Sequence, residues 1–487
     1  MHKTIPWVSV LTFALFWFSQ VSAQPSLLWD HFYGGDDNEE VHSLLPTNDG
    51  GCMIAGLTES FGYGEFGRPD IWILKLDDAG GVQWSQSYGV PDSLEQAYHM
   101  IETTDGSYLA AGYKCEQWGF GGGDAILLKI DSAGNEEWFR QYGGSEDDGL
   151  RFIQQDPAGG FIACGWTRST GAGFVDAWVI RFDESGSILW AHPFGGTEYD
   201  VAKTVYPQPD GGYLVSGYTS SQGAGGNDAW LFKLDSEGTL EWECVYGGEG
   251  MDRAYFSAPS GDGNYVLTGI RDVGSEGDLW ILKVDPLGNV IWEQTHDMAA
   301  DDEGHYIEST TDGGYAVAAW AGFEGNPWTQ MWLLKLDSAG EIVWDTIHGG
   351  PASDWANVIR QVSPRDYLVG GGTLSDGHGR VDMWVLKLRD DEVTGIEIPI
   401  PKNFELNCFP NPFNPSTTLE LNLPEGGMAS LRLFDCTGRE ITRVFEGYLS
   451  GGIQRFTLDA ENLSSGIYMA RLEIGGHTFS RKIMLAK

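Results

Sequence analysis

The feature that most constrains the fold is a unit of about fifty residues that recurs along most of the chain. The pattern D-x-W-x-x-K, with one substitution allowed per copy, begins at Asp70, Asp124, Asp176, Asp228, Asp278, Gln330 and Asp382. Successive copies begin 50 to 54 residues apart. Seven copies at so regular a period predict an array of one supersecondary unit, in which each copy buries its apolar surface against its neighbours.

Each copy has the pattern of four short strands. In the unit from Tyr199 to Gly248, an alternating stretch reaches the turn at Asp210–Gly212, and "YLVSGYT", "DAWLFKLD" and "TLEWECVY" follow. Alternating polarity, β-branched and aromatic residues, and Gly/Asp punctuation favour strands over helices. Four strands at this period predict an all-β chain, most of which is a seven-bladed β-propeller with four-stranded blades.

The two ends of the repeat array complement each other. The seventh unit has its third strand, "DMWVLKLRD" at residues 382–390, but no fourth strand follows it. The stretch "SLLWDHFYGG", which contains Trp29, reads as a fourth strand without the other three. If this N-terminal strand closes the last blade, no sheet edge is left exposed. We therefore predict a closed propeller over residues 24–390.

A second motif, Asp-x-x-Gly-x-x-x-Trp, recurs within the units, as in "DSAGEIVW" from Asp337 to Trp344. We expect the Asp to bind local backbone donors, the Gly to adopt a φ that other residues resist, and the Trp to fill the wedge between blades. Thirteen of the twenty tryptophans lie at repeat positions. They are Trp72, Trp178, Trp230, Trp280, Trp332 and Trp384 on third strands, and Trp29, Trp84, Trp138, Trp190, Trp242, Trp292 and Trp344 on fourth strands.

The N-terminal 23 residues predict export. Lys3, an apolar run from Val8 to Phe18 and a small-residue site ending at Ala23 describe a signal peptide over residues 1–23. This run is too short to span a membrane, and no later segment reaches a spanning length. The formal net charge of −41 argues against nucleic acid as a partner, because phosphate binding requires clustered Lys and Arg.

The C-terminal part has a different character. Residues 391–403 are acidic and contain proline, which is typical of a linker, and residues 404–487 alternate like the strands of a small Ig-like β-sandwich. This segment resembles the C-terminal sorting domain of type IX secretion cargo in bacteria of the Bacteroidetes–Fibrobacteres–Calditrichota range. The matching residues include Pro410, Asn411, Pro412, Asp435, Gly438, Gly466, Tyr468 and Lys482. The resemblance implies the type IX machinery as a partner, and a secreted or surface-attached product.

The repeats also resemble known propellers. They are similar to the tryptophan-docking repeats of quinoprotein dehydrogenases and to exported bacterial propellers. The vicinal cysteine pair that many of those enzymes place beside the quinone is missing from the sequence, so we predict no cofactor. Of the six cysteines, Cys408 and Cys436 are the one pair worth testing as a disulfide, and the other four are expected to be buried free thiols.

A repeated acid stands at the entry to each inner strand. The seven residues are Glu39, Glu95, Asp148, Asp200, Asp252, Asp302 and Asp354. We expect each of them to cap its own turn or to bond to the next blade, because every blade has the same need. The alternative is a weak calcium site, in which several of these carboxylates would share a cation at the channel mouth.

Three residues after each acid, the units differ from one another. These positions are occupied by His42, Tyr98, Arg151, Lys203, Tyr255, His305 and Asn357, and the loops nearby carry Tyr63, Trp118 and Trp328. A role in holding the scaffold together would repeat in every blade, so we predict that these residues bind a ligand. Aromatic side chains of this kind suit stacking on sugar rings or anchoring a protein partner.

Three functions follow from this sequence. The leading hypothesis is a non-enzymatic binding module, at the cell surface or outside the cell, for a glycan or protein ligand. The second is an exported glycan-active hydrolase or lyase that uses the same face. The third is a structural component of the cell envelope. We assign no catalytic residue, because the sequence contains no G-x-S-x-G, H-E-x-x-H or P-loop motif.

Overall fold

The computed structural model describes residues 24–63, 68–116, 122–273, 276–298, 300–323 and 326–391, and seven shorter segments between 405 and 486. Those segments are 405–409, 416–423, 427–435, 439–449, 452–460, 463–474 and 477–486. The chain divides into two compact units between Glu392 and Val393. The expected signal peptide and residues 392–403 of the expected linker lie outside the described residues.

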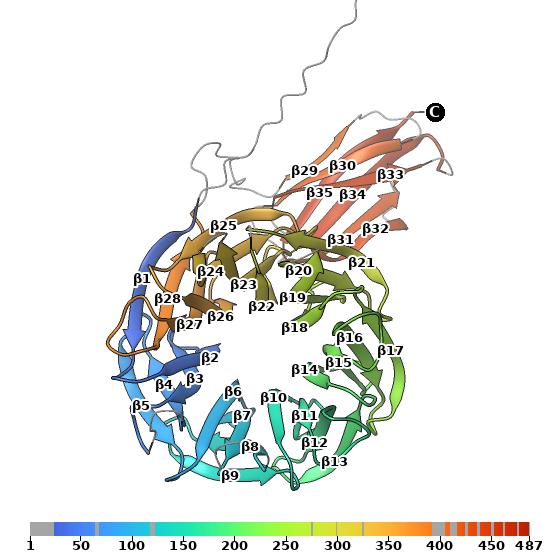
Figure 1. Ribbon diagram of the computed structural model, residues 1–487. Coiled ribbons are helices and arrows are strands. Elements are labelled where there is room, and N and C mark those ends of the chain that lie inside the picture. The colour runs from blue at the N-terminus through green and yellow to red at the C-terminus, as the bar shows by residue number, and fades with distance from the viewer. Residues whose placement is uncertain are drawn as a thin grey trace, which may run out of the picture. The chain divides into compact units, whose positions relative to one another are not determined.

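Over the described residues, the first unit consists of seven four-stranded antiparallel sheets around a central axis (Figure 1). The innermost strands are β2 (Glu39–Pro46), β6 (Leu94–Glu102), β10 (Asp148–Gln155), β14 (Asp200–Pro207), β18 (Arg253–Pro259), β22 (Glu303–Ser309) and β26 (Asp354–Gln361). We number the blades 1 to 7 in this order. The second strands are β3 (Cys52–Thr58), β7 (Tyr108–Cys115), β11 (Phe161–Thr167), β15 (Tyr213–Thr219), β19 (Tyr265–Val273), β23 (Tyr315–Phe323) and β27 (Asp366–Thr373).

The outer half of each blade holds the third and fourth strands, which carry the repeated tryptophans except in β8, where Ile126 takes that place. The third strands are β4 (Asp70–Leu76), β8 (Asp124–Ile130), β12 (Asp176–Phe182), β16 (Asp228–Leu234), β20 (Glu276–Val284), β24 (Asn326–Leu336) and β28 (Asp382–Arg389). The fourth strands are β5 (Val82–Tyr88), β9 (Glu136–Tyr142), β13 (Ile188–Phe194), β17 (Leu240–Tyr246), β21 (Val290–His296), β25 (Ile342–His348) and β1 (Ser26–Tyr33).

The N-terminal strand closes the ring, as the sequence predicts. Strand β1 pairs antiparallel with β28, with Trp29 opposite Lys387 and Phe32 opposite Trp384. The last sheet therefore has the order β1-β28-β27-β26, joining the two ends of the array in one blade. The prediction of a seven-bladed propeller closed by its N-terminal strand is confirmed.

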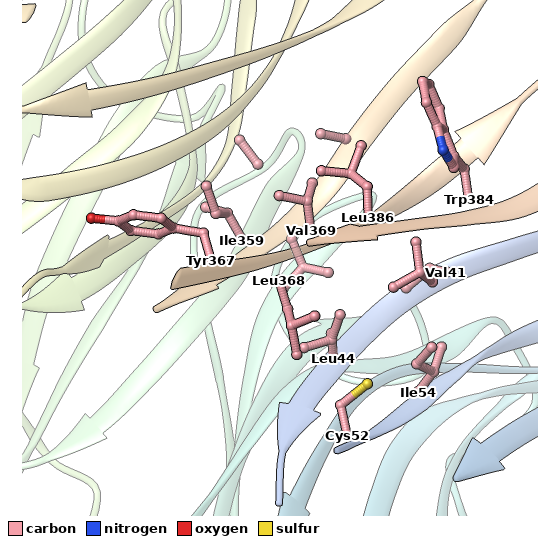
Figure 2. Close-up of a cluster of buried hydrophobic side chains, with 14 of the residues drawn as sticks. Val41, Leu44, Cys52, Ile54, Ile359, Tyr367, Leu368, Val369, Trp384 and Leu386 are labelled. Atoms are coloured by element: carbon pink, nitrogen blue, oxygen red, sulfur yellow. The ribbon is translucent and has the colours of Figure 1, made fainter. Parts of the chain in front are cut away.

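The apolar core lies between blades rather than at one centre. Separate clusters of buried side chains fill the interfaces between successive blades. Figure 2 shows part of the cluster where the last blade meets the first, with Val41 and Leu44 of β2 near Leu368 and Val369 of β27. Each blade buries both of its faces, so its central strands are apolar on both sides.

In blades 1 to 6, the Asp-x-x-Gly turn joins the blade to the one before it. In blade 2, the backbone N–H groups of Ala133 and Asn135 each donate to Asp131 Oδ1 at 2.9 Å, and Gly134 has a φ of 83°. The Trp84 ring of blade 1 covers this glycine, and the Tyr88 hydroxyl donates to the Gly134 carbonyl at 2.6 Å. The tryptophan therefore packs on the turn of the next blade.

The same contact closes the circle. Trp29 and Tyr33 of β1 reach the turn of blade 1, where the Trp29 indole N–H donates to the Asp78 carbonyl at 3.2 Å and the Tyr33 hydroxyl to the Gly80 carbonyl at 2.6 Å. The third-strand tryptophans are all at least 93% buried. These positions are structural, as the repeat pattern indicates.

The second unit is a small β-sandwich. One sheet contains β29 (Glu405–Phe409), β30 (Ser416–Leu423) and β33 (Gly452–Asp459). The other contains β31 (Gly427–Asp435), β32 (Glu440–Leu449), β34 (Gly466–Ile474) and β35 (His477–Leu485). Side chains from both sheets, such as Leu419 and Leu472, share one buried cluster. This agrees with the Ig-like sandwich that the sequence predicts.

Some of the sorting-motif residues can be placed within this sandwich. Gly466 begins β34. The Tyr468 ring is buried, and its hydroxyl donates a hydrogen bond to the Ser464 carbonyl at 2.7 Å. Lys482 lies on β35 and is exposed. Pro410, Asn411, Pro412, Gly438 and Cys436 lie outside the described residues. The Cys408–Cys436 disulfide therefore stays a prediction. Cys52, Cys115, Cys164 and Cys244 form no disulfide among the described residues. Cys52 and Cys164 are buried as expected, whereas Cys115 and Cys244 are only half-buried, so that part of the expectation is wrong.

Two glycines of matched backbone conformation separate the contributions of the turn and of the tryptophan. Gly134 and Gly106 have φ values of 83° and 81°, but an added Cβ meets the Trp84 ring at 2.9 Å in the first and nothing within 4 Å in the second. We expect Gly106→Ala to lower the free energy of unfolding by about 1 kcal/mol, through backbone strain alone. Gly134→Ala should cost about 1–3 kcal/mol more, because it also pushes the indole away. Denaturant unfolding of the two variants measures the difference, and equal losses would show that the Trp84 contact contributes nothing.

Candidate functional site

All seven inner strands contain a β-bulge at the variable position. In β2 the pairing register shifts between Val41 and Ser43, so His42 is the extra residue without a partner on β3. The same shift leaves out Tyr98, Arg151, Lys203, Tyr255, His305 and Asn357 in the other six inner strands. A bulge re-aims one side chain while the strand on either side stays paired. The fold thus presents one freely variable side chain from every blade.

A glycine on the second strand makes room for the bulge. A Cβ added at Gly56, Gly217 or Gly371 would overlap the carbonyl oxygen of Glu40, Val201 or Trp355, each two residues before the bulged residue. Gly112, Gly165 and Gly269 meet the corresponding carbonyls in blades 2, 3 and 5 in the same way. Blade 6 differs, with Ala319 on the second strand and Gly304 just before the bulge. Glycine inside a strand is a known sign of such close backbone approach.

The bulged residues converge on one cavity. All seven line a central hollow of about 360 Å³, at the end of the inner strands where the repeated acids lie. The loops between second and third strands emerge at this same end, because Glu39 at the start of β2 pairs with Thr58 at the end of β3. The structure therefore brings together the seven residues that the sequence singles out.

Neighbouring bulged side chains stack on one another in two arcs. In the first, the His42 ring stacks on Tyr98 with centroids 5.3 Å apart, and the Arg151 guanidinium lies 3.9 Å from the Tyr98 centroid. In the second, the Lys203 ammonium lies 5.5 Å from the Tyr255 centroid, and the Tyr255 ring stacks on His305 at 5.2 Å. Each arc runs from a cation through a tyrosine to a histidine, and the two cations belong to adjacent blades.

A glutamate stands beside the histidine of each arc. Glu40 Oε2 lies 3.5 Å from His42 Nε2, and Glu40 Oε1 accepts hydrogen bonds from the Trp355 indole at 2.9 Å and the Asn357 amide at 3.0 Å. Burial alone would raise the pKa of Glu40, but these partners outweigh it and lower the pKa to about 2. In the second arc, Glu303 Oε2 lies 3.2 Å from His305 Nε2. Both carboxylates are therefore already partnered within the cavity wall.

Lys203 is the most perturbed cation of the cavity. Burial lowers the pKa of its ammonium group well below the usual range, and the nearby Arg151 and Arg253 guanidinium groups lower it further. Its contacts are the faces of Tyr255 and Tyr218, whose centroids lie 5.5 Å and 5.6 Å away. No carboxylate among the described residues lies within ion-pair distance of Lys203.

Aromatic side chains form the floor of the cavity. Ring contacts lead from His99 to Phe152 at 4.0 Å, from Phe152 to Phe256 at 5.6 Å and from Phe256 to Tyr306 at 4.1 Å. These four residues and Arg360 line both the central cavity and a second hollow of about 450 Å³ farther along the axis. The Arg360 guanidinium is paired with Glu308 on that far side, at 3.0 Å. The central cavity therefore opens at the end where the repeated acids lie.

The repeated acids serve the scaffold. All seven are at least 99% buried, and each accepts a hydrogen bond from the loop that precedes its inner strand. Asp200, for example, accepts from the Gly196 N–H at 2.8 Å, from the Ser221 hydroxyl at 2.7 Å and from the Thr219 hydroxyl. No group of three or more His, Cys, Asp or Glu side chains suited to a metal occurs among the described residues. Calcium binding stays a prediction, and the acids occupy separate positions in the ring.

The loop aromatics are placed differently from the bulged residues. Tyr63 and Trp328 are 61% and 44% exposed, and neither lines the central cavity. Trp118 lies outside the described residues. Of the ligand-binding residues predicted from the sequence, the seven bulged residues thus lie together at the central cavity, and the described loop residues lie outside it.

Sequence reasoning missed the residues that hold the bulged side chains in place. The rings of Trp166, Tyr218 and Trp320 on second strands contact Arg151, Lys203 and His305, at 4.8, 5.6 and 3.8 Å. Glu40, Glu303 and Trp355, two residues before bulged positions, were also not singled out. The mid-strand glycine followed by an aromatic residue, as in "CGWT" and "SGYT", is the signal that could have found the first group.

Comparisons with known proteins identify the C-terminal unit. Residues 407–486 match the family model of the secretion system C-terminal sorting domain, so that part of the sequence-based prediction is confirmed. No curated protein sequence matches the chain significantly. The described residues contain no helix long and apolar enough to cross a membrane.

Several solved structures are similar at low identity. PorZ, a surface component of the type IX secretion system of Porphyromonas gingivalis, is 12% identical with a TM-score of 0.43, covering 93% of this chain and 60% of PorZ. A protein of unknown function from Dyadobacter fermentans is 13% identical with a TM-score of 0.44, covering 62% and 97%. A polysaccharide lyase acting on ulvan is 9% identical with a TM-score of 0.45, covering 72% and 95%. This chain thus spans 60% of the length of PorZ, and likenesses at this level assign no ligand or activity.

One of the repeated acids makes stability depend on pH. Burial, followed by Asp297 and Asp278, raises the pKa of Asp302 to about 7 from its ordinary value of 3.8. Between about pH 4 and 7 the folded state thus keeps a proton that the unfolded state has released, so this group's contribution to stability falls as pH rises. Asn cannot titrate, so the melting temperature of Asp302→Asn should rise relative to that of the native protein between about pH 5 and 8. A difference that stays constant over this range would contradict the raised pKa.

Proposed function

We propose that this protein is an exported binding propeller, which acts at the cell surface or outside the cell and holds one unit of a glycan in its central cavity without cleaving it. One observation carries the proposal. Seven identical bulges deliver seven side chains of five different types into one cavity, whereas the acids beside them are the same in kind and are used by the fold. A purely structural ring would repeat its contacts, so variation at the convergent position supports a ligand.

The dimensions and chemistry of the cavity favour a sugar over a protein partner. A hollow of about 360 Å³ is at the lower end of small-ligand pockets, whereas stable protein interfaces bury more than about 1,000 Å² of surface. Aromatic rings alternate with hydrogen-bonding groups such as Asn357, the histidines and the tyrosine hydroxyls. A pyranose ring offers both apolar C–H faces and hydroxyl groups, and this lining matches both.

The C-terminal unit supports export. The chain carries a secretion sorting domain at residues 407–486, and the sequence before residue 24 has the pattern of a signal peptide. The resemblance of the sorting motif to that of type IX cargo makes the type IX machinery the proposed export partner. Deleting residues 405–487 should leave the propeller inside a type IX-competent host, while the full chain reaches the surface or medium. Immunoblots of cell fractions measure this, and surface delivery of the truncated chain would exclude the sorting role.

Glycan binding is tested with two variants that lie in different places. We expect the full chain to bind a subset of a glycan array, and Tyr98→Ala to weaken that binding about tenfold or more, because it removes a ring from the cavity wall. Trp328→Ala is the matched control, since it removes a large aromatic side chain from the same end of the propeller outside the cavity. Calorimetry on the array hits measures both affinities, and melting curves confirm that each variant is folded.

The outcomes separate the three functions. Loss of binding in Tyr98→Ala but not in Trp328→Ala supports the cavity, and the reverse moves the site to the loops. Incubation of each hit with the protein, followed by chromatography of the glycan, tests for cleavage. Shortened products would replace the binding module by a hydrolase or lyase. No binding to any glycan on the array would overturn the proposal.

A further inference from the structure

Two neighbouring cations of the cavity stand out from the other basic groups of this chain. The sequence has 29 Lys and Arg residues against 70 Asp and Glu residues, so acidic partners are plentiful. Five of the six lysines of the third strands lie within 3.0 Å of an acid: Lys75 with Asp49, Lys129 with Asp105, Lys233 with Asp210, Lys283 with Asp262 and Lys335 with Asp312. Arg151 and Lys203 form no such pair among the described residues.

Their contacts are with ring faces rather than with anions. The Arg151 guanidinium lies 3.9 Å from the Tyr98 centroid and 4.8 Å from that of Trp166, and its buried Nε has no hydrogen-bond partner. The Lys203 ammonium lies between the faces of Tyr218 and Tyr255. Arg253, one blade farther on, has a neutral partner, because its Nε donates to Asn227 Oδ1 at 2.6 Å. The Glu303 carboxylate acts electrostatically on Lys203 and Arg253, but its ion pair is with His305. Arg151 and Lys203 thus have no ion-pair partner among the described residues.

The two acids of the cavity form their closest contacts with other groups. Glu40 is held by His42, Trp355 and Asn357, and Glu303 by His305 at 3.2 Å. A buried unpaired cation is costly, and a cluster of like charges adds to that cost. The mutual effect is visible at Lys203, where burial and the two guanidinium groups lower the pKa of the ammonium group well below its usual range. An anion placed between these groups would relieve both penalties.

We propose that the Arg151–Lys203 side of the cavity binds a carboxylate or sulfate group of the ligand, so that the glycan unit held there is an acidic sugar. The planar guanidinium presents paired donors that match the oxygens of either group, while the lysine supplies a point charge. This inference rests on the proposed glycan binding and names its ligand class.

The test compares sugars that differ only in the acidic group. D-glucuronate, D-glucose 6-sulfate and D-glucose are titrated into the full chain and followed by ligand-observed NMR. We expect one of the two anionic sugars to bind at least about tenfold more tightly than glucose, as charge-assisted hydrogen bonds in a buried site imply. Which of the two is preferred distinguishes a uronate site from a sulfate site. The same comparison is made on any polysaccharide found by the array, before and after carboxyl reduction or desulfation.

Two variants and one control locate the effect. Arg151→Gln and Lys203→Met should each reduce the preference for the anionic sugar about tenfold or more, while Arg271→Gln, which removes a charge paired with Glu293 outside the cavity, should leave it unchanged. Lys203→Met should also keep or raise the melting temperature, because it removes an unpaired buried charge and retains the apolar stem. A merely structural lysine would give a lower melting temperature and no change in the preference.

The failures of the two proposals are distinguishable. Equal affinity for glucose and for both anionic sugars, with the array still positive, would overturn the anion site and leave glycan binding in place. An unchanged preference in both Arg151→Gln and Lys203→Met would also overturn it. If no monosaccharide and no glycan on the array binds, the proposed function itself is overturned, and this inference with it.

Discussion

The contact on which the structure depends is the packing of one blade's outer strand on the turn of the next blade. The Asp-x-x-Gly turn offers a glycine without a side chain, and the preceding blade covers it with a tryptophan and, at four of the six turns, with a tyrosine hydroxyl. Six of the seven interfaces between blades contain this contact, because blades 1 to 6 each have the turn, so the contact recurs around almost the whole ring. Trp29 and Tyr33 close the ring through this contact, so the N-terminal strand has a structural role out of proportion to its length.

In this closed ring, the structural role and the proposed ligand-binding role belong to different residues that lie three positions apart at the start of each inner strand. The acid at the start of each inner strand is buried and bonded within its blade, while the residue three places later leaves the ladder in a bulge. The bulge leaves the flanking residues paired, so the bulged side chain can change without changing the blade. This explains how His42, Arg151 and Asn357, which share no chemistry, occupy equivalent places in one fold. Function can therefore vary at the axis while the interfaces between blades remain the same.

The sequence predicts the scaffold well because the scaffold repeats. The period and the two tryptophan positions recur from unit to unit, and the strand missing from the last unit is found at the N-terminus. An ambiguous pattern in one unit can therefore be interpreted by comparison with the other units. The seven bulged residues were also found, through variation against a repeated acid rather than through any knowledge of the bulge. Trp166, Tyr218 and Trp320 were missed because they contact the bulged side chains from another strand, across a register that a bulge has shifted. The pairing of Glu40 with Trp355 joins residues 315 positions apart, and no local pattern signals it.

The charge of the molecule sharpens what its cavity can select. A chain with a net charge of −41 repels anionic polymers at long range, but salt at physiological strength screens such forces beyond about 8 Å. Inside the cavity, Arg151 and Lys203 act on a desolvated partner with little screening, so their effect is local and strong. A nucleic acid gains little from two cations in the wall of a small hollow, because its binding depends on many surface contacts. A single acidic group on a ring that fits within about 360 Å³ can reach both cations at once, because Arg151 and Lys203 lie on adjacent blades and line the same cavity.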